Sequence, residues 1–517
     1  MKRLSPTLTT LFLTLGAAAS AQPGSLDNSF SSDGKVTTAF GSGLDFGFSV
    51  AVQLDGRIVV AGNTDNGSDR DFALARYNMD GTVDNSFSGD GKVTTAFGSG
   101  NDIGLAVAIQ PDGRIVMAGF AYVGSGRDFV LARYNTDGTL DNSFSADGKV
   151  TTDFGTGDAG DDDGWSVAIQ QDGRIVVAGY SNIGTSVDFA LARYNTDGTL
   201  DNSFSADGKV TTDFGTGDDS GASVAIQLDG KIVVAGSSSG DFALARYNTD
   251  GTLDNSFSGD GKVTTDFGTG SSNGRSVAIQ PDGKIVVAGR AYVGTDSDLA
   301  IARYSTDGTL DNSFSGDGKV STDFGTVGAD GNSVTIQSNG KIIVAGSASN
   351  GTDSDFVLAR YNTDGTPDNG FGVNGKVTTA FGTDSDSGES VAIAPDGKIV
   401  VAGSTYNGIA SDFALARYIS GLNVGIVDLS LANSAPLIYP NPINHHATLE
   451  YTLQNAEVIS IQLLDMQGRT VQTFIAGQVQ AAGAHRLTID LPEALTSGQY
   501  LIAISSPNGK FMVQVVK

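Results

Sequence analysis

A segment of about sixty residues is repeated seven times in this chain. One copy, from Ser276 to Phe324, reads SVAIQPDGKIVVAGRAYVGTDSDLAIARYSTDGTLDNSFSGDGKVSTDF. A tyrosine marks each copy, with steps of 57, 60, 53, 57, 57 and 57 residues between Tyr77, Tyr134, Tyr194, Tyr247, Tyr304, Tyr361 and Tyr418. Self-similarity at such a period predicts a repeat architecture in which every copy is one structural unit.

Each copy contains four short segments typical of β-strands, which in the fifth copy are residues 276–280, 284–289, 298–304 and 318–324. They are rich in Val, Ile, Thr and aromatic residues and are bounded by Gly, Asp or Asn. The turn between the first two ends in Gly in all seven copies, as a tight hairpin requires. The second segment is apolar on both faces, which predicts a strand buried on both sides.

A four-stranded antiparallel sheet covered on both faces and repeated seven times is typical of a β-propeller blade, so we expect a seven-bladed, all-β propeller. A solenoid is the alternative, but its terminal units usually differ from the middle ones. Here the repeats begin with a lone fourth strand (residues 34–40) and end with a lone third strand (residues 412–418). Pairing of these two segments would complete the last blade and remove an exposed sheet edge.

The recurring KIVVAG, DFALARYNTDG and TLDNSF segments resemble the delta-60 repeat of bacterial secreted proteins. The resemblance covers about residues 26 to 418 and implies a β-propeller without a defined activity.

Several classes of chemistry are disfavoured by composition. The 31 Lys and Arg against 58 Asp and Glu give a net charge of -27, which repels nucleic acid phosphates. The chain has no cysteine, so it has neither disulfides nor thiolate chemistry. All three histidines, His445, His446 and His485, lie outside the repeats, so histidine-based metal sites and Ser-His-Asp triads are excluded there.

Residues 1–21 have the order of a secretory signal peptide, with a basic head, an apolar run and an Ala-Ser-Ala cleavage pattern before Gln22. A buried N-terminal helix is the alternative interpretation. The rest of the chain contains no apolar segment of about 18 residues, so no transmembrane helix is expected.

The turns of a propeller open alternately on its two faces, and both length changes among the copies fall on the face that carries the second-to-third and fourth-to-first connections. The longest of these loops, GTGDAGDDDGWS, contains Asp161, Asp162, Asp163 and Trp165, the only tryptophan in the chain. Variable loops on a constant scaffold often bind ligands. These four residues are therefore candidates for binding a glycan or a calcium-bridged ligand. The interpretation that we favour is a solvated acidic loop whose tryptophan packs on a neighbouring blade.

Two further repeated features have a structural and a functional interpretation. The arginine before each repeat tyrosine could form an anion-binding ring, but we expect it to connect blades by bonding aspartates or carbonyls of the NTDGTLDNSF turn. The recurring N-x-D-G-x-x-D pattern, as at Asn78, Asp80 and Asp84, is expected to form Asx turns. Structural calcium is the alternative there, and no other cofactor is expected, although the EF-hand positions for an acid and a glutamate hold Arg76 and Phe87.

After a linker, residues 419–434, the repeat character ends. Residues 435–517 contain alternating segments that predict a small Ig-like β-sandwich. This domain resembles the type A sorting domain of the type IX secretion system of Bacteroidota in several spaced motifs. The matching residues include Tyr439, Pro440, Asn441, Pro442, Gly468, Gly498 and Tyr500. The resemblance implies export by the type IX secretion machinery, removal of the domain, and release or attachment at the outer-membrane surface.

The domain plan is thus a signal peptide (1–21), a propeller (22–418), a linker (419–434) and a sorting domain (435–517). We expect a secreted, non-catalytic scaffold that binds a glycan or a protein. The alternatives are an extracellular hydrolase or lyase using paired carboxylates, and a structural surface-coat component. Repeats this similar offer no unique carboxylate pair outside Asp158 to Asp163, which weighs against the enzyme.

Overall fold

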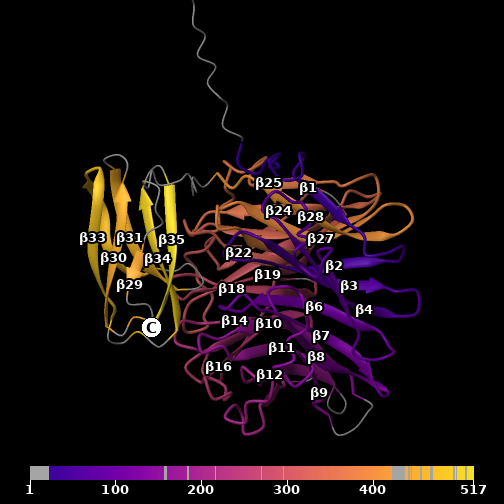
Figure 1. Ribbon diagram of the computed structural model, residues 1–517. Helices are drawn as coiled ribbons and strands as arrows, with labels where there is room; N and C mark the ends of the chain where they lie inside the picture. Colours follow the sequence, from indigo (N-terminus) through magenta and orange to yellow (C-terminus); the bar gives the residue numbers. More distant parts are fainter. Residues whose placement is uncertain are drawn as a thin grey trace, which may run out of the picture.

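The computed structural model describes residues 22–155, 160–182, 186–215, 217–268, 270–294, 296–325, 327–421, 437–439, 443, 445–453, 457–465, 470–492, 495, 498–506 and 509–517 (Figure 1). The predicted signal peptide and residues 422–434 of the predicted linker lie outside this part of the chain.

The repeats form seven four-stranded antiparallel blades arranged in a ring (Figure 1), which confirms the predicted fold. The blades are, in order, β2 (Asp45–Val52), β3 (Ile58–Asp65), β4 (Arg70–Tyr77), β5 (Lys92–Thr95); β6 (Asp102–Ile109), β7 (Ile115–Val123), β8 (Gly126–Tyr134), β9 (Lys149–Thr152); β10 (Asp162–Ile169), β11 (Ile175–Asn182), β12 (Val187–Tyr194), β13 (Lys209–Thr212); β14 (Asp219–Ile226), β15 (Ile232–Ser238), β16 (Asp241–Tyr247), β17 (Lys262–Thr265); β18 (Ser272–Ile279), β19 (Ile285–Val293), β20 (Asp296–Tyr304), β21 (Lys319–Thr322); β22 (Gly328–Ile336), β23 (Ile342–Ser349), β24 (Ser354–Tyr361), β25 (Lys376–Thr379); and β26 (Asp386–Ile393), β27 (Ile399–Tyr406), β28 (Ser411–Tyr418) with β1 (Lys35–Thr38).

The second strand of each blade is buried on both faces, as its apolar sequence predicts. In β3, residues 58–61 are Ile-Val-Val-Ala and each is at most 1% exposed. Their side chains alternate between two clusters of buried residues, one shared with each neighbouring blade. The hydrophobic core is therefore divided into layers, one between each pair of neighbouring blades. Buried residues from both blades form each layer.

The ring is closed by the first strand of the repeat region. Strand β1 pairs antiparallel with β28, with Lys35 opposite Ala416 and Thr38 opposite Phe413. The lone fourth strand thus completes the blade that lacks one, and the predicted closure is confirmed. Pairing removes the free edge that an open arrangement would leave on β28.

Every junction between blades contains the same arginine contact. Arg76 donates through Nε to Asp84 in its own blade at 2.8 Å and through Nη1 to the carbonyl of Thr136 in the next blade. Its guanidinium also lies over the ring of Phe87, 4.5 Å from the centroid. The equivalent contact with the next turn recurs at Arg133, Arg193, Arg246, Arg303, Arg360 and Arg417. The prediction that these arginines connect blades is confirmed.

The aspartates of the N-x-D-G-x-x-D pattern make the hydrogen bonds of Asx turns. Thr82 N donates to Asp80 Oδ1 and Ser86 N donates to Asp84 Oδ1, each at 3.0 Å. Asp84 Oδ2 also accepts a hydrogen bond from Arg76, so both carboxylate oxygens of Asp84 are bonded within the protein.

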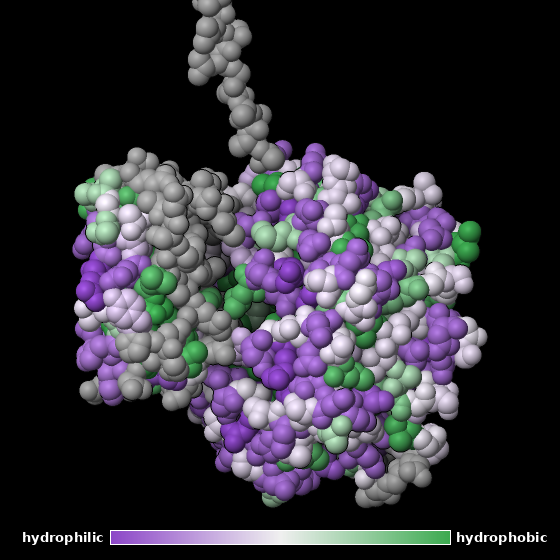
Figure 2. Space-filling view, viewed as in Figure 1, coloured by the Kyte–Doolittle hydropathy of each residue, from purple (hydrophilic) through white to green (hydrophobic). Residues whose placement is uncertain are grey.

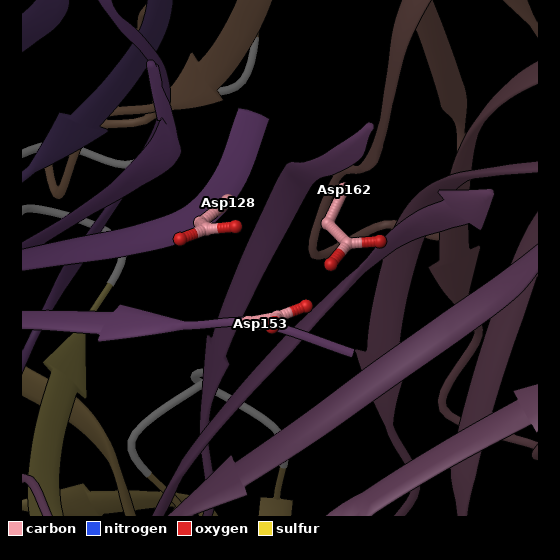
Figure 3. A group of neighbouring side chains, drawn as sticks. All are labelled: Asp128, Asp153 and Asp162. Carbon is pink, nitrogen blue, oxygen red and sulfur yellow. The ribbon is translucent and has the colours of Figure 1, made fainter. Parts of the chain in front are cut away.

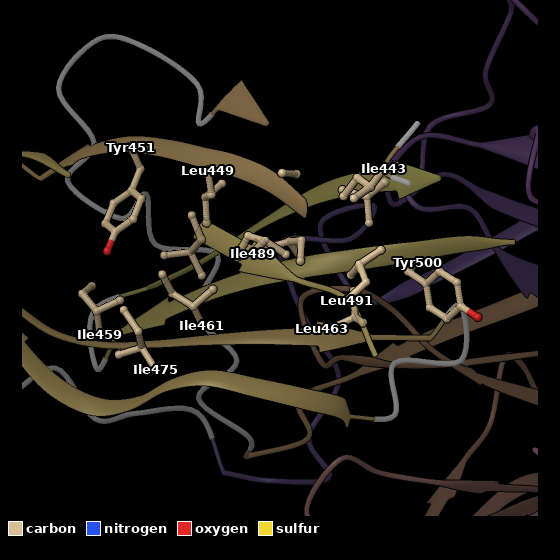
Figure 4. Packing of buried hydrophobic residues seen from close by; sticks show 14 of the residues in the cluster. Ile443, Leu449, Tyr451, Ile459, Ile461, Leu463, Ile475, Ile489, Leu491 and Tyr500 are labelled. Atoms are coloured by element: carbon tan, nitrogen blue, oxygen red, sulfur yellow. The ribbon is translucent and has the colours of Figure 1, made fainter. Parts of the chain in front are cut away.

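The C-terminal domain is a two-layer sandwich (Figures 1 and 4). One sheet is β29 (Leu437–Tyr439), β30 (His446–Leu453) and β33 (Gly483–Asp490); the other is β32 (Thr470–Gln480), β31 (Glu457–Leu464), β34 (Gln499–Ser506) and β35 (Gly509–Val516). Leu449 and Ile489 of the first sheet pack with Ile461 of the second in a shared core. Within the part of the chain that the structure describes, no helix is long and apolar enough to cross a bilayer.

Candidate ligand-binding site in the central channel

Seven inner strands, β2, β6, β10, β14, β18, β22 and β26, surround the propeller axis. A serine in one inner strand accepts a hydrogen bond from a valine backbone N–H in the next, as from Val107 N to Ser49 Oγ at 3.2 Å. The contact recurs at five other junctions, with Ser166, Ser223, Ser276, Ser333 and Ser390 as acceptors. Ala106 replaces this serine between the second and third blades. The inner strands are therefore joined at six of the seven junctions by hydrogen bonds from a backbone N–H to a serine hydroxyl.

Each inner strand carries a β-bulge, as between Gly47 and Ser49 in β2. The glycine before the bulge has no room for a side chain, because a Cβ at Gly47 would lie 2.6 Å from the carbonyl oxygen of Gly403 in the preceding blade. The serine after the bulge faces the following blade. The bulged residue between them, Phe48, is thus the one turned toward the channel, in keeping with the role of bulges in redirecting a side chain.

The bulged residue is different in all seven blades, although its flanking residues hardly change: Phe48, Leu105, Trp165, Ala222, Arg275, Asn332 and Glu389. We call these seven residues the channel ring. Its members in the first three blades are large and apolar, whereas those in the last three are polar. A repeat that is nearly uniform elsewhere therefore forms a channel with two chemically distinct halves.

The polar half of the channel ring is bonded from blade to blade. Arg275 Nη1 lies 3.0 Å from Asp330 Oδ2 and also donates to Asn332. Asn332 Nδ2 donates to the carbonyl of Gly388 at 2.9 Å. Burial raises the pKa of Glu389, whose carboxyl accepts from Ser387 Oγ. These polar side chains are thus engaged by polar partners, whereas Phe48, Leu105 and Trp165 offer apolar contact surface.

The structure gives Asp162 a different role from the other three residues that the sequence placed in one site. Asp162 is 1% exposed and accepts from Phe154 N at 2.7 Å. The same bond to a phenylalanine N–H is made by Asp45, Asp102, Asp219 and Asp386 in other blades. Asp162 is therefore a repeated structural residue. Trp165 belongs to the channel ring, where 42% of its surface is exposed.

Asp161 and Asp163 share one arginine that the sequence analysis did not select. Arg127 Nη1 lies 3.0 Å from Asp163 Oδ2, and Arg127 Nη2 lies 3.1 Å from Asp161 Oδ2. Tyr180 donates its hydroxyl to Asp163 Oδ2 at 2.5 Å. Burial raises the pKa of Asp163 to about 6, even though Tyr180 and Arg127 favour its charged form.

Two more aromatic side chains, Phe120 and Tyr122, lie next to Arg127 and its carboxylate partners. The Arg127 guanidinium lies over the ring of Phe120, 5.0 Å from its centroid, and Phe120 meets Tyr122 edge to face. Tyr122 is 45% exposed. We define the aromatic cluster as Phe120, Tyr122, Arg127, Asp161, Asp163 and Tyr180; Trp165 of the channel ring follows Asp163 by two residues in β10. A column-by-column comparison of the repeats would have shown Phe120 and Tyr180, because the other copies hold Asn63, Ser237, Arg290, Ser347 and Ser404 at their position.

The other ends of β2, β6 and β10 face the sandwich. A cavity of about 160 Å³ lies there between Val52, Ile109 and Ile169 of the propeller and Asp465 and Tyr500 of the sandwich. Figure 2 shows the surface hollowed between the two domains, with hydrophobic residues at the edge.

The residues of the predicted sorting motif are only partly within the described chain. Tyr439 donates its hydroxyl to Glu450 at 2.6 Å at the surface of the sandwich, and Tyr500 is part of its core. Gly498 exchanges two backbone hydrogen bonds with Lys517. Pro440, Asn441, Pro442 and Gly468 lie outside the described residues.

Comparisons with known proteins agree with this architecture. A family model described as Domain of unknown function (DUF5122) beta-propeller matches seven segments, residues 53–87, 110–144, 170–204, 227–257, 280–314, 337–371 and 394–420. A second, described as Secretion system C-terminal sorting domain, matches residues 437–517. This domain directs the chain through the type IX secretion machinery to the cell surface or the extracellular space.

Solved structures similar to this chain include other propellers at low sequence identity. A catalytically inactive virginiamycin B lyase from Staphylococcus aureus with quinupristin is 11% identical, with 74% of this chain and 98% of that chain covered and a TM-score of 0.45. A streptogramin B lyase is 11% identical, with 74% and 97% covered and a TM-score of 0.45. The polysaccharide lyase Uly1 is 14% identical, with 72% and 90% covered and a TM-score of 0.41.

A search of curated proteins found no match. The matched segments cover the second and third strands of every blade and the whole sandwich. The chain is therefore a secreted protein with seven segments that match the DUF5122 β-propeller model and a C-terminal sorting domain of the type IX secretion system.

Proposed function

We propose that the protein is a non-catalytic scaffold at the cell surface or outside the cell that binds a glycan at the apolar half of its central channel. The observation that carries this proposal is the variation of the channel ring on a scaffold whose structural residues repeat. Scaffold residues such as the blade-connecting arginines recur in every copy, whereas Phe48, Leu105 and Trp165 do not. Residues that serve only the fold would be expected to repeat with it.

The chemistry of Trp165 and of the aromatic cluster suits a sugar. Trp165 and Tyr122 present exposed aromatic surface, against which the apolar face of a pyranose ring can pack. Arg127 and Asp161, which is about half exposed, supply a donor and an acceptor for hydroxyl groups beside these rings. Binding sites of this type combine apolar walls with a few placed polar groups.

Binding is favoured over hydrolysis by the position of Asp163. A general acid needs a raised pKa, and Asp163 has one, but its side chain is only 2% exposed. Tyr180 and Arg127 both bond the same oxygen, Oδ2. We infer that Asp163 positions Arg127 for a ligand instead of donating a proton to it.

The proposal is tested by screening the chain from Gln22 to Lys517 on a broad glycan array, with and without calcium. Selective retention of a glycan that is lost in Trp165→Ala and Tyr122→Ala supports it. Tyr292→Ala is the matched control, because Tyr292 occupies the position of Tyr122 in the fifth blade and is exposed there. Retention unaffected by Trp165→Ala would place the ligand elsewhere, and no retention at all would favour a protein partner or a structural coat.

A further inference from the structure

Two arginines of the fifth blade meet the same carboxylate beside the channel. Arg275 belongs to the channel ring in β18, and Arg290 lies in the neighbouring strand, β19. Arg275 Nη1 lies 3.0 Å from Asp330 Oδ2 in the next blade, and Arg290 Nη1 lies 3.9 Å from the same oxygen. We call Arg275 and Arg290 the arginine pair. Asp330 can neutralise only one of its two positive charges.

Arg290 has hydrogen-bonding capacity that the protein does not use. A guanidinium group carries several N–H donors, yet Arg290 makes no hydrogen bond to any residue that the structure describes, and Asp330 is its one ionic partner there. Its side chain is 36% exposed. Arg303 of the same blade, which connects blades, instead donates to Thr363 and Ser313 and is buried. The guanidinium of Arg290 is therefore available to a ligand.

The fold does not require an arginine at either position of the pair. No other member of the channel ring is an arginine, and the position of Arg290 is occupied in the other six copies by Asn63, Phe120, Tyr180, Ser237, Ser347 and Ser404. Both arginines occur in the same copy and lie against the same oxygen. Two residues that depart from the repeat together in this way indicate a common role outside the scaffold.

The other polar residues beside the arginine pair do not compete strongly for it. Asn332 donates to the carbonyl of Gly388 at 2.9 Å, and its side-chain oxygen accepts from Arg275. The carboxyl of Glu389 accepts from Ser387 Oγ, and burial raises the pKa of Glu389, which favours its uncharged form. The arginine pair thus keeps a local excess of positive charge.

Carboxylates, in contrast, gather in the second, third and fourth blades. Figure 3 shows Asp128, Asp153 and Asp162, and one carboxylate oxygen of each lies within 4.8 Å of the other two. An equivalent group one blade later consists of Asp188, Asp213 and Asp219. These groups would repel an anion and the arginine pair would attract it. The charges therefore favour one orientation of an anionic ligand, with its negative group at the fifth and sixth blades.

We propose that the arginine pair binds the carboxylate or sulfate group of an acidic glycan. This inference rests on the proposed function, because it assigns the chemical class of the glycan that the channel would bind. Guanidinium groups bind such oxyanions through paired, charge-assisted N–H···O bonds. Arg290 would supply its unused donors and Arg275 additional positive charge, while the sugar rings extend to the apolar half of the channel.

The glycan array tests this inference when each acidic glycan is printed beside its neutral form. Oligogalacturonate with its carboxyl-reduced form is the carboxylate probe, and a sulfated galactan oligosaccharide with its desulfated form is the sulfate probe. We expect the chain from Gln22 to Lys517 to retain an acidic member and to bind the neutral form of the same glycan about tenfold more weakly. The probe that is retained decides between carboxylate and sulfate.

Arg290→Gln removes the available charge and should weaken binding of the retained acidic glycan by about tenfold. Because Arg290 makes no hydrogen bond to the described residues, the melting temperature of this variant and its affinity for neutral glycans should not change. Arg174→Gln is the matched control. Arg174 is similarly exposed, with 38% of its side chain accessible, and directly precedes β11 at the other end of the blades. It should bind like the unaltered chain.

The inference is overturned if the neutral forms bind as tightly as the acidic ones, or if Arg290→Gln and Arg174→Gln have the same affinity for the acidic glycan. Either result leaves glycan binding at the channel intact. The absence of any retained glycan would instead overturn the proposed function, and this inference with it.

Discussion

Arg417 Nε donates to Asp27 Oδ2 at 2.8 Å across 390 positions of the chain. This pair is the counterpart of Arg76 and Asp84 within the first blade, which are only eight positions apart. Lys398 Nζ lies 2.7 Å from the same Asp27 oxygen. The start of the repeat region thus supplies to the last blade the carboxylate that every other blade provides for itself, and the ring depends on it.

Deletion of residues 22–40 should open the ring. The deletion removes β1, the fully buried Phe30 and the carboxylate partner of Arg417. Loss of a buried aromatic side chain or of one partner of a buried ion pair each costs about 3–5 kcal/mol. We expect a much lower melting temperature, measured by circular dichroism. A melting temperature equal to that of the intact chain would show that the ring does not need this strand.

Acid should destabilise the propeller through its paired aspartates. Burial alone would raise the pKa of Asp27, but Lys398, Ser29 and Arg417 more than offset this and lower it to about 2. The folded-state pKa is below the unfolded value near 3.8, so this stabilisation is present above pH 4 and is lost as the pH falls toward 2. The pKa values of Asp84 and Asp141 are also lowered.

The melting temperature should therefore fall steeply between pH 4 and pH 2. Asp27→Asn serves as the comparison, because it should melt at a lower temperature at neutral pH and lose part of this pH dependence. A melting temperature that stays constant down to pH 2 would contradict the stabilising role of the paired aspartates.

The protonation of Asp163 should be visible in the emission of Trp165. The pKa of Asp163 is raised to about 6, above its unfolded value, so its buried charge costs stability above pH 6 and this cost disappears as the pH falls toward 4. We expect the fluorescence of Trp165, two residues away, to titrate with a midpoint near pH 6. Asp163→Asn should abolish the titration, and a flat profile in the unaltered chain would exclude a raised pKa.

The hydroxyl of the repeat tyrosine should contribute equally to the free energy of unfolding at the ring closure and at an internal junction between blades. Tyr77 donates to Thr38 Oγ1 across the closure and Tyr247 donates to Thr212 Oγ1 between the third and fourth blades, both at 2.8 Å. Both tyrosines are fully buried. Tyr77→Phe and Tyr247→Phe should each cost about 0.5–1.5 kcal/mol in the free energy of unfolding, measured by denaturant titration. A clearly larger loss at Tyr247 alone would mean that the closure junction is loosely packed.

The scaffold could be predicted because each of its features repeats. Seven copies of the hairpin glycine, the doubly apolar second strand and the arginine before the tyrosine each point to one architecture. The lone strand at residues 34–40 predicted the closure because it had no other partner. Each of these signals comes from residues close together in the sequence, and it is more reliable because it occurs in every copy.

The candidate site could be predicted only in part, because its geometry depends on a bulge. The run Asp161-Asp162-Asp163 looks like one acidic loop. Strand pairing instead makes Asp162 accept the hydrogen bond from Phe154 N that recurs in other blades, and it places Asp163 beside Arg127. The hydrophobic pattern does not encode the register shift at Gly164 that places Trp165 at the channel. Arg127 was missed because it lies at the start of β8, just before the DFVLARY residues that look alike in every copy.

A titration of Trp165 fluorescence with a glycan retained on the array tests the central claim most directly. Trp165 is the only tryptophan and forms part of the channel ring, so a ligand in the apolar half must change its surroundings. We predict a saturable change in emission with the same midpoint as binding measured by calorimetry. Calorimetric binding with unchanged emission would contradict the account, since the ligand would then lie outside the channel.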